Sequence, residues 1–151
     1  MIITSLVEND RLSGRPELVA EHGVSIHVQL PELSLLFDTG ASDAFVGNAR
    51  RLQVELAQVD KVVISHHHYD HAGGLERFLA LNRDAPVYLG RAGPGEPYAK
   101  LLGVITRRIG MDRTLLQNMP KRFVEVDART EIAPGVFVLT DIPRRHPLPP
   151  G

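Results

Sequence analysis

The most restrictive feature of this sequence is a short apolar run that leads directly into a cluster of histidines. Residues 62–64 are Val, Val and Ile, and the ten residues that follow are SHHHYDHAGG. β-Branched residues in a short apolar run favour a buried strand. Gly73 and Gly74 allow positive φ angles or a close approach of the backbone to a metal-bound group. The stretch therefore predicts a strand that ends in a metal-binding loop.

Four side chains of this loop belong to types that bind a borderline divalent cation: His66, His68, Asp70 and His71. The sequence has no cysteine, so a thiolate site is excluded. In an extended segment alternate side chains share one face, which groups the first three of these residues. A turn after Tyr69 would then bring His71 round to Asp70. A solvated histidine run is the alternative, but the internal position after a strand favours a metal site.

The same residues resemble the signature loop of the metallo-β-lactamase superfamily, and residues 37–40 (FDTG) resemble the acidic turn that precedes that loop. The wider pattern is similar to the branch that holds the archaeal-type synthase joining a dihydropterin to a ribofuranosylaminobenzene phosphate. It comprises residues 20–25, 36–40 and 48–49 with the histidine loop. The resemblance extends from near the start of the chain to Arg144.

This resemblance implies a site with two divalent metal ions, zinc in the first place, with iron or manganese as alternatives. It assigns His66 and His68 to one metal, and Asp70 and His71 to the other. Asp70 would also orient the bridging water and is the predicted catalytic residue. Asp38 is expected beneath the metals, where it would orient the loop, although a simple turn-forming role is the alternative.

The implied fold is α/β: the N-terminal half of an αββα sandwich, with a mixed β-sheet and flanking helices. We expect one domain over residues 1–144 and a proline-rich, disordered tail over residues 145–151. In the superfamily the remaining metal ligands come from the second half of the sandwich, so the chain is expected to be truncated. Asp141 and His146 are the alternative ligands by residue type.

The resemblance implies a metal-dependent hydrolase that uses a metal-bound hydroxide, or a pterin-related transferase, with a small-molecule substrate. Arg107, Arg108 and Arg113 are candidates to contact an anionic or phosphate-bearing substrate, or form a solvated face. A truncated, catalytically incomplete metal-binding fragment is the alternative function, with self-association through uncovered apolar surface. A redox di-iron site is a third alternative, because the same fold hosts it. Whether the chain is an enzyme stays open.

Composition and net charge limit the kinds of partner that we expect for this chain. The formal net charge of -1 and the isoelectric point near 6.7 predict no binding to nucleic acid or to an anionic membrane. The start of the chain has no basic leader, and no apolar run is long enough to span a bilayer. Together with the absence of cysteine, these features predict a cytoplasmic protein.

Hydrophobic periodicity predicts the remaining elements. Strands are expected over residues 2–7, 24–30, 33–37, 62–65, 86–89, 122–126 and 136–139, and helices over residues 42–52 and 75–81. The turn 133–135 is expected to separate the last two strands.

Two further histidines flank or occupy the second predicted strand. His27 alternates with apolar residues and is expected on a polar, solvated face. His22 precedes the strand and is a candidate either for the rim of the active cleft or for a structural or solvent role.

Overall fold

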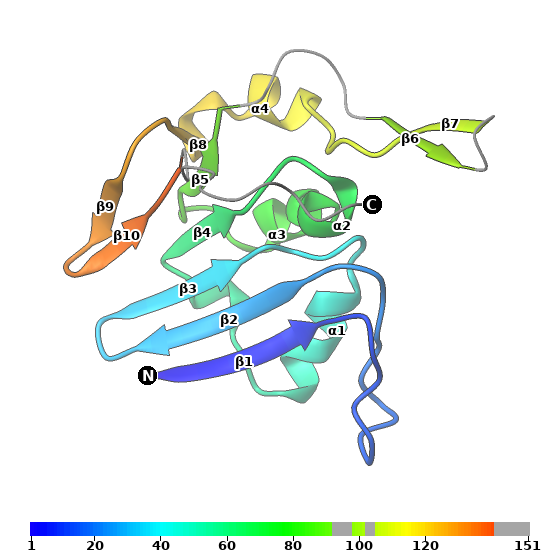
Figure 1. Ribbon diagram of the computed structural model, residues 1–151. Helices are drawn as coiled ribbons and strands as arrows, with labels where there is room; N and C mark the ends of the chain where they lie inside the picture. The colour runs from blue at the N-terminus through cyan, green and yellow to red at the C-terminus, as the bar shows by residue number, and fades with distance from the viewer. Residues whose placement is uncertain (92–97, 102–104, 141–151) are drawn as a thin grey trace, which may run out of the picture.

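The computed structural model describes residues 1–91, 98–101 and 105–140 (Figure 1). The alternative ligands Asp141 and His146 and the predicted tail at residues 145–151 lie outside the described residues. The side chain of Arg107 also lies outside them.

A six-stranded mixed sheet forms the centre of the molecule. Its order is β1 (Ile2–Val7), β2 (Ser25–Leu30), β3 (Leu33–Phe37), β4 (Lys61–Ile64), β5 (Val87–Gly90) and β8 (Phe123–Val126). The first three strands are antiparallel, and β3, β4, β5 and β8 are parallel. Because carboxyl ends of parallel strands meet at one edge, the residues after β3, β4 and β5 gather there.

Helices cover one face of this sheet (Figure 1). The longest are α1 (Ala44–Arg51) and α3 (Leu75–Leu81), with the 3₁₀ turn η1 (Leu56–Gln58) beside them. The first predicted helix is confirmed as α1, and its residues Phe45, Val46 and Ala49 are buried. They share one core with Leu36 and with apolar side chains of β4 and β5. Burial of this apolar surface is the main stabilising term of the fold.

A hairpin covers part of the opposite face. It consists of β9 (Thr130–Ala133) and β10 (Val136–Val138), and Ile132 packs with Leu33, Leu35 and Val63 in a second core. Leu35 faces this hairpin while Leu36 faces the helices, as the alternation of side chains along a strand requires.

The predicted turn at residues 133–135 is confirmed, with Gly135 at φ 75°, but the strand that enters it is β9, which was not predicted. β8 joins the main sheet beside β5, and β10 pairs with β9. β9 contains Thr130 and Glu131 and has no continuous apolar run, so periodicity gave no signal for it. The other elements are α4 (Thr114–Asn118), η2 (Pro120–Arg122) and the hairpin of β6 (Tyr98–Leu101) and β7 (Ile105–Arg108).

The prediction that His27 is solvated was wrong, because only 7% of this residue is exposed. His27 is aligned with Thr4 on β1 and Leu36 on β3, so it faces the helical layer. Its Nε2 atom lies 2.9 Å from the hydroxyl of Ser34. Alternation shows which residues share a face, but it does not show which face the helices will cover.

The arrangement confirms the predicted α/β class, with a mixed sheet and flanking helices. Within the described ranges, none of the helices has the length and apolar composition that crossing a bilayer requires.

Candidate metal centre

The histidine loop follows β4 at the carboxyl edge of the sheet. The strand ends at Ile64, and a single helical turn, α2 (Tyr69–Ala72), carries Asp70 and His71. The turn thus begins at Tyr69, and Asp70 belongs to the helix instead of continuing an extended segment. Gly73 and Gly74 do not have positive φ angles.

These two glycines instead allow the loop to approach the backbone of the turn that follows β3. A Cβ atom on Gly73 would overlap the carbonyl oxygen of Ala41, and one on Gly74 would overlap that of Thr39. The amide of Gly73 donates to the carbonyl of Gly40 at 2.9 Å. The glycines therefore serve a contact between two segments of backbone, where a metal-bound group was expected.

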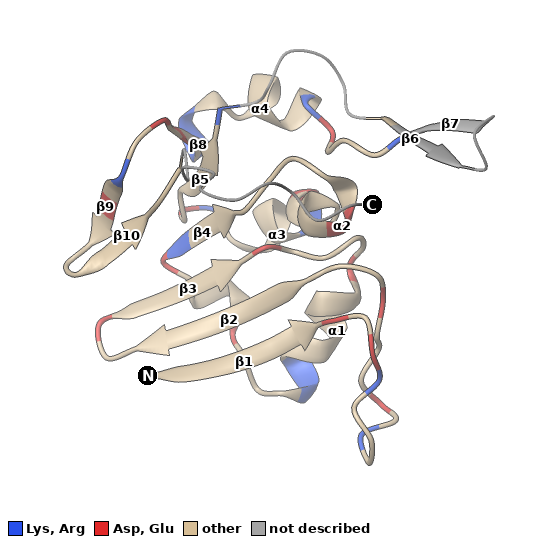
Figure 2. Cartoon of the chain, in the orientation of Figure 1, with Lys and Arg blue, Asp and Glu red and all other residues tan. Residues whose placement is uncertain are grey.

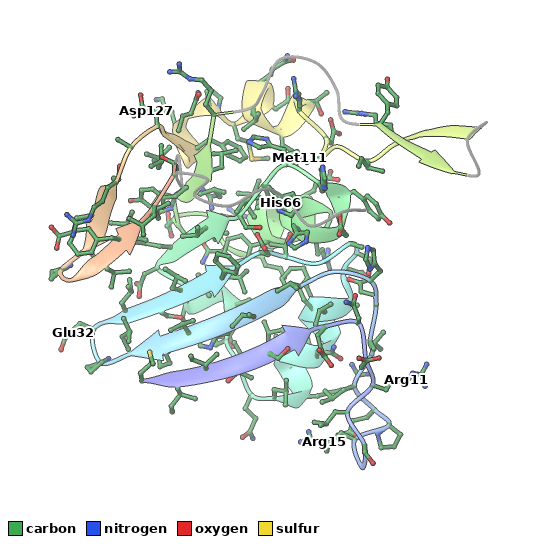
Figure 3. All side chains as sticks on the ribbon, in the orientation of Figure 1. Arg11, Arg15, Glu32, His66, Met111 and Asp127 are labelled. Atoms are coloured by element: carbon green, nitrogen blue, oxygen red, sulfur yellow. The ribbon has the colours of Figure 1, made fainter. Side chains whose placement is uncertain are left out.

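A second backbone segment holds the other side of the loop. The amide of Tyr69 donates to Ile109 at 2.7 Å, and the amide of Met111 donates to His67 at 2.8 Å. Figure 3 shows His66 near α2, with the chain that carries Met111 passing above it. The loop is thereby fixed from two sides before any ligand binds.

The structure brings the four predicted ligands close together. The ring centroids of His66 and His68 are 4.5 Å apart, and those of His66 and His71 are 4.1 Å apart. The Nε2 atom of His71 lies 3.5 Å from Oδ2 of Asp70. Within the part of the chain that the structure describes, no three His, Asp or Glu side chains already surround a point where a metal ion would sit.

Asp38 lies directly beneath this cluster and is completely buried. Its φ angle is 58°, so the chain turns sharply at the end of β3. One carboxylate oxygen accepts the amide of Ser65 at 2.7 Å, and the other accepts the Ser65 hydroxyl at 2.7 Å. The second oxygen also lies 2.7 Å from Nδ1 of His71.

These contacts determine which ring nitrogens are free. A carboxylate only accepts, so Nδ1 of His71 carries a proton, and in the neutral ring Nε2 then keeps its lone pair. The Ser65 hydroxyl donates to Asp38, so at 3.0 Å it accepts from Nδ1 of His66. His66 therefore also presents Nε2 with a free lone pair. A hydrogen bond behind an imidazole that fixes its tautomer is typical of metal sites.

Desolvation favours the same form of His66. Partial burial of the ring, followed by the nearby His71 and His68 rings, lowers the pKa of His66 below its ordinary value. The neutral imidazole that results is the form that binds a metal.

Several residues at this edge were not predicted to have a role. Ser65 connects Asp38 to His66, and Glu21 accepts hydrogen bonds from the amides of Ala41 and Ser42 at 3.0 and 3.1 Å. Both lie in the sequence segments that carry the resemblance. Nothing in the local sequence indicates these particular partners, because the segments meet only in the folded chain.

His67 has a different environment from its neighbours in the loop. Its Nε2 atom lies 2.7 Å from the carbonyl of Gly90 at the end of β5. Its Nδ1 atom is buried and has no hydrogen-bond partner among the described residues. The middle histidine of the run thus joins the loop to the sheet.

The predicted anion-binding arginines are only partly described. Arg108 donates through Nη2 to the carbonyl of Met111 at 3.1 Å. Arg113 directly precedes α4, and Figure 2 shows basic residues on both sides of α4.

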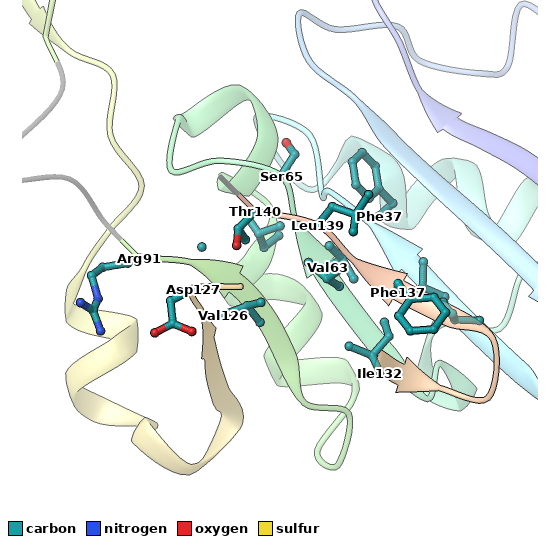
Figure 4. A pocket seen from close by; sticks show the side chains of 15 residues that line it. Phe37, Val63, Ser65, Arg91, Val126, Asp127, Ile132, Phe137, Leu139 and Thr140 are labelled. Carbon is teal, nitrogen blue, oxygen red and sulfur yellow. The ribbon is translucent and has the colours of Figure 1, made fainter. Parts of the chain in front are cut away.

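An open cleft of about 920 Å³ begins beside Ser65 and runs between the sheet and β10 (Figure 4). Its walls are mainly apolar and include Phe37, Val63 and Phe137. Arg91 and Asp127 lie at its more polar side. The cleft therefore connects the edge that carries the histidines with the hairpin.

Comparison with known proteins identifies the family of this chain. A family model described as the metallo-beta-lactamase superfamily matches residues 20–143. The 7,8-dihydropterin-6-methyl-4-(beta-D-ribofuranosyl)-aminobenzene-5'-phosphate synthase of Methanocaldococcus jannaschii is 25% identical over 137 residues, which are 82% of this chain and 45% of that protein. A hydroxyacylglutathione hydrolase of Shewanella halifaxensis is 36% identical over 61 residues, or 37% of this chain and 24% of that protein.

Among solved structures, a quorum-quenching N-acyl homoserine lactone hydrolase is 22% identical and superposes with a TM-score of 0.54. The match covers 78% of this chain and 50% of that chain, and it shows a likeness of fold. This chain thus spans half or less of the length of these relatives.

Proposed function

Because this chain belongs to the metallo-β-lactamase superfamily, we propose that its histidine loop binds divalent metal ions and that these serve a hydrolase-type reaction on a small molecule. The proposed ligands are His66 and His68 for one metal and Asp70 and His71 for the other. We propose zinc, because imidazole and carboxylate ligands suit it, with iron or manganese as alternatives. The proposed domain covers residues 1–144.

One observation carries this proposal: the buried Asp38 fixes the loop in a form ready to bind a cation. Its contacts with Ser65 and His71 engage the Nδ1 atoms of His66 and His71, which leaves the Nε2 atoms of both rings for a cation at the edge of the sheet. Asp70 adds a carboxylate oxygen beside one of them. Hydrogen bonds of this kind behind the ring are typical of histidines that bind metals.

A metal bound here would act as a Lewis acid and make water available as a nucleophile near neutral pH. Asp70 is proposed to contribute a ligand oxygen and to orient the attacking water. Asp38 is proposed to hold the loop in place throughout. The adjoining cleft, with Phe37, Val63 and Phe137, suits a substrate that has an apolar or aromatic part.

The likeness to the synthase of Methanocaldococcus jannaschii supports a pterin-related transfer as the more specific form of this proposal. The name of that synthase includes a phosphate group, so the proposal of a pterin-related transfer includes a phosphate-bearing substrate. Arg91 lines the cleft but pairs with Glu125 at 2.8 Å, so it would have to exchange partners to bind an anion.

A second candidate function is metal binding without turnover. It is favoured by the finding that no closed group of three ligands exists within the described residues. The apolar walls of the open cleft beside β10 would then support association between copies of the chain.

Metal content and turnover of the purified chain distinguish these functions. We expect stoichiometric zinc by elemental analysis, loss of that zinc in His66→Ala and His68→Ala, and retention in His67→Ala, which is the matched control. Hydrolysis of simple esters or phosphodiesters that stops with a chelator and returns with zinc would support the enzyme. Metal without turnover supports the second candidate, and a chain that retains no metal after dialysis contradicts both.

A further inference from the structure

We propose that His22, which lies outside the histidine loop, is a further metal ligand and binds through Nε2 to the same ion as Asp70 and His71. The inference rests on the proposed function, because it needs a metal at the loop. It assigns a ligand to a segment between β1 and β2 that is distant from the loop in the sequence.

Two imidazole nitrogens lie close to the same carboxylate oxygen of Asp70. Nε2 of His22 lies 3.4 Å from Oδ2 of Asp70, and Nε2 of His71 lies 3.5 Å from the same oxygen. Two atoms bound to one zinc at about 2.0 to 2.1 Å in tetrahedral geometry are about 3.3 Å apart. Each imidazole therefore stands at the separation from Asp70 that a shared metal would require.

The contact between His22 and Asn9 indicates which nitrogen of the His22 ring faces the site. Oδ1 of Asn9 accepts the amide of Gly23 at 3.1 Å, which identifies it as the amide oxygen. The same oxygen lies 3.2 Å from Nδ1 of His22, so this nitrogen carries the proton and Nε2 has a free lone pair. Asn9 thus accepts a hydrogen bond from Nδ1 of His22, as Asp38 does from Nδ1 of His71.

Nε2 of His22 and Nε2 of His71 therefore both lie within 3.5 Å of one carboxylate oxygen, Oδ2 of Asp70. In neutral rings with Nδ1 protonated, both nitrogens are acceptors, and a cation bound between them and the carboxylate removes the repulsion among the three. A divalent metal satisfies all three at once, as a ligand set of two histidines and one carboxylate.

The backbone of the His22 segment is fixed against the loop. Gly23 has a φ angle of 138°, and a Cβ atom there would overlap the carbonyl oxygen of Asp70. The amide of Val24 donates to that same carbonyl at 3.3 Å. The His22 side chain is 73% exposed, so little packing opposes a small movement that would complete the ligand set around the ion.

Histidine ring ¹⁵N spectra of the full chain, recorded before and after saturation with Zn²⁺, test this directly. We expect the Nε2 resonances of His22 and His71 to change together to metal-bound positions, while the resonances of His27 stay in place. His22→Ala should lower the affinity for the second zinc equivalent by roughly 10-fold or more, since loss of even an outer hydrogen-bond partner costs 10- to 100-fold. Glu8→Ala, in the same segment, is the matched control and should bind normally.

The two proposals fail in different ways. If the loop histidines shift with zinc and His22 does not, the metal centre stands and the assignment of His22 is overturned. If none of them shifts, the proposed metal centre fails and the His22 assignment fails with it.

Discussion

Nδ1 of His71 lies 2.7 Å from a carboxylate oxygen of Asp38, which is 33 residues earlier in the chain. Asp38 is buried at the end of β3, and His71 lies on the helical turn after β4. These strands are parallel neighbours, so their carboxyl ends deliver both side chains to one edge. The contact fixes the tautomer that leaves Nε2 of His71 available.

Replacing the buried carboxylate tests this relationship. Asp38→Asn should lower the free energy of unfolding by about 1 to 3 kcal/mol, because an amide group would face donors from Ser65 and His71. Metal affinity should fall by roughly 10- to 100-fold. Chemical unfolding and a zinc competition assay measure the two effects. Asparagine tolerates positive φ, so backbone strain is not the cause, and an unchanged zinc affinity would contradict the proposed role.

Two glycine variants distinguish the effect of the close contact between Gly23 and Asp70 on stability from the effect of a positive φ angle. Gly23→Ala should destabilise the protein by more than about 2 kcal/mol, because its Cβ would overlap the Asp70 carbonyl. Gly14→Ala is the control, since Gly14 has a φ angle of 81° but nothing lies within 4 Å of the added atom. It should cost only about 1 to 2 kcal/mol. Equal losses in thermal or chemical unfolding would show that the contact contributes nothing.

His67 should separate structural support from metal binding. His67→Ala removes the contact with the Gly90 carbonyl at 2.7 Å and should cost about 1 to 3 kcal/mol of stability. Zinc per chain should stay at the wild-type value, because the ring is directed to β5. The measurement is elemental analysis beside an unfolding curve. Loss of zinc from folded His67→Ala would mean that the ligand set proposed here is wrong.

His27 predicts a dependence of stability on pH. Burial lowers the pKa of His27, so the unfolded chain takes up a proton at a pH where the folded chain does not. Stability is therefore complete above the unfolded value of about 6.5 and falls as the pH is lowered through it. His27→Gln should show a shallower loss between about pH 7.5 and pH 5.5 when unfolding is measured with a chelator present.

The control for this measurement is Gln29→Ala, on the same strand as His27, because it removes no titratable group. Its pH profile should match that of the wild type. A His27→Gln profile as steep as the wild type would assign the effect to other histidines.

The sequence alone predicted most of the regular structure near the site. Alternation and apolar runs located β1 to β5 and β8, and the stripe of Phe45, Val46 and Ala49 predicted α1. The spacing of the four loop residues predicted the candidate ligands, because that chemistry depends on residue type and short offsets. β9 escaped prediction, since a short strand with Thr130 and Glu131 carries no clear period.

By itself, the sequence predicted most of the strands, two helices and the four candidate ligands, because these follow from patterns among residues close in the chain, and its family resemblance implied the α/β class. The tertiary structure decided that His27 is buried, that Asp38 fixes His71, and that His22 approaches Asp70. Those outcomes depend on which strands become neighbours and which face the helices cover. They arise from packing between distant segments, and no local pattern of residues encodes them.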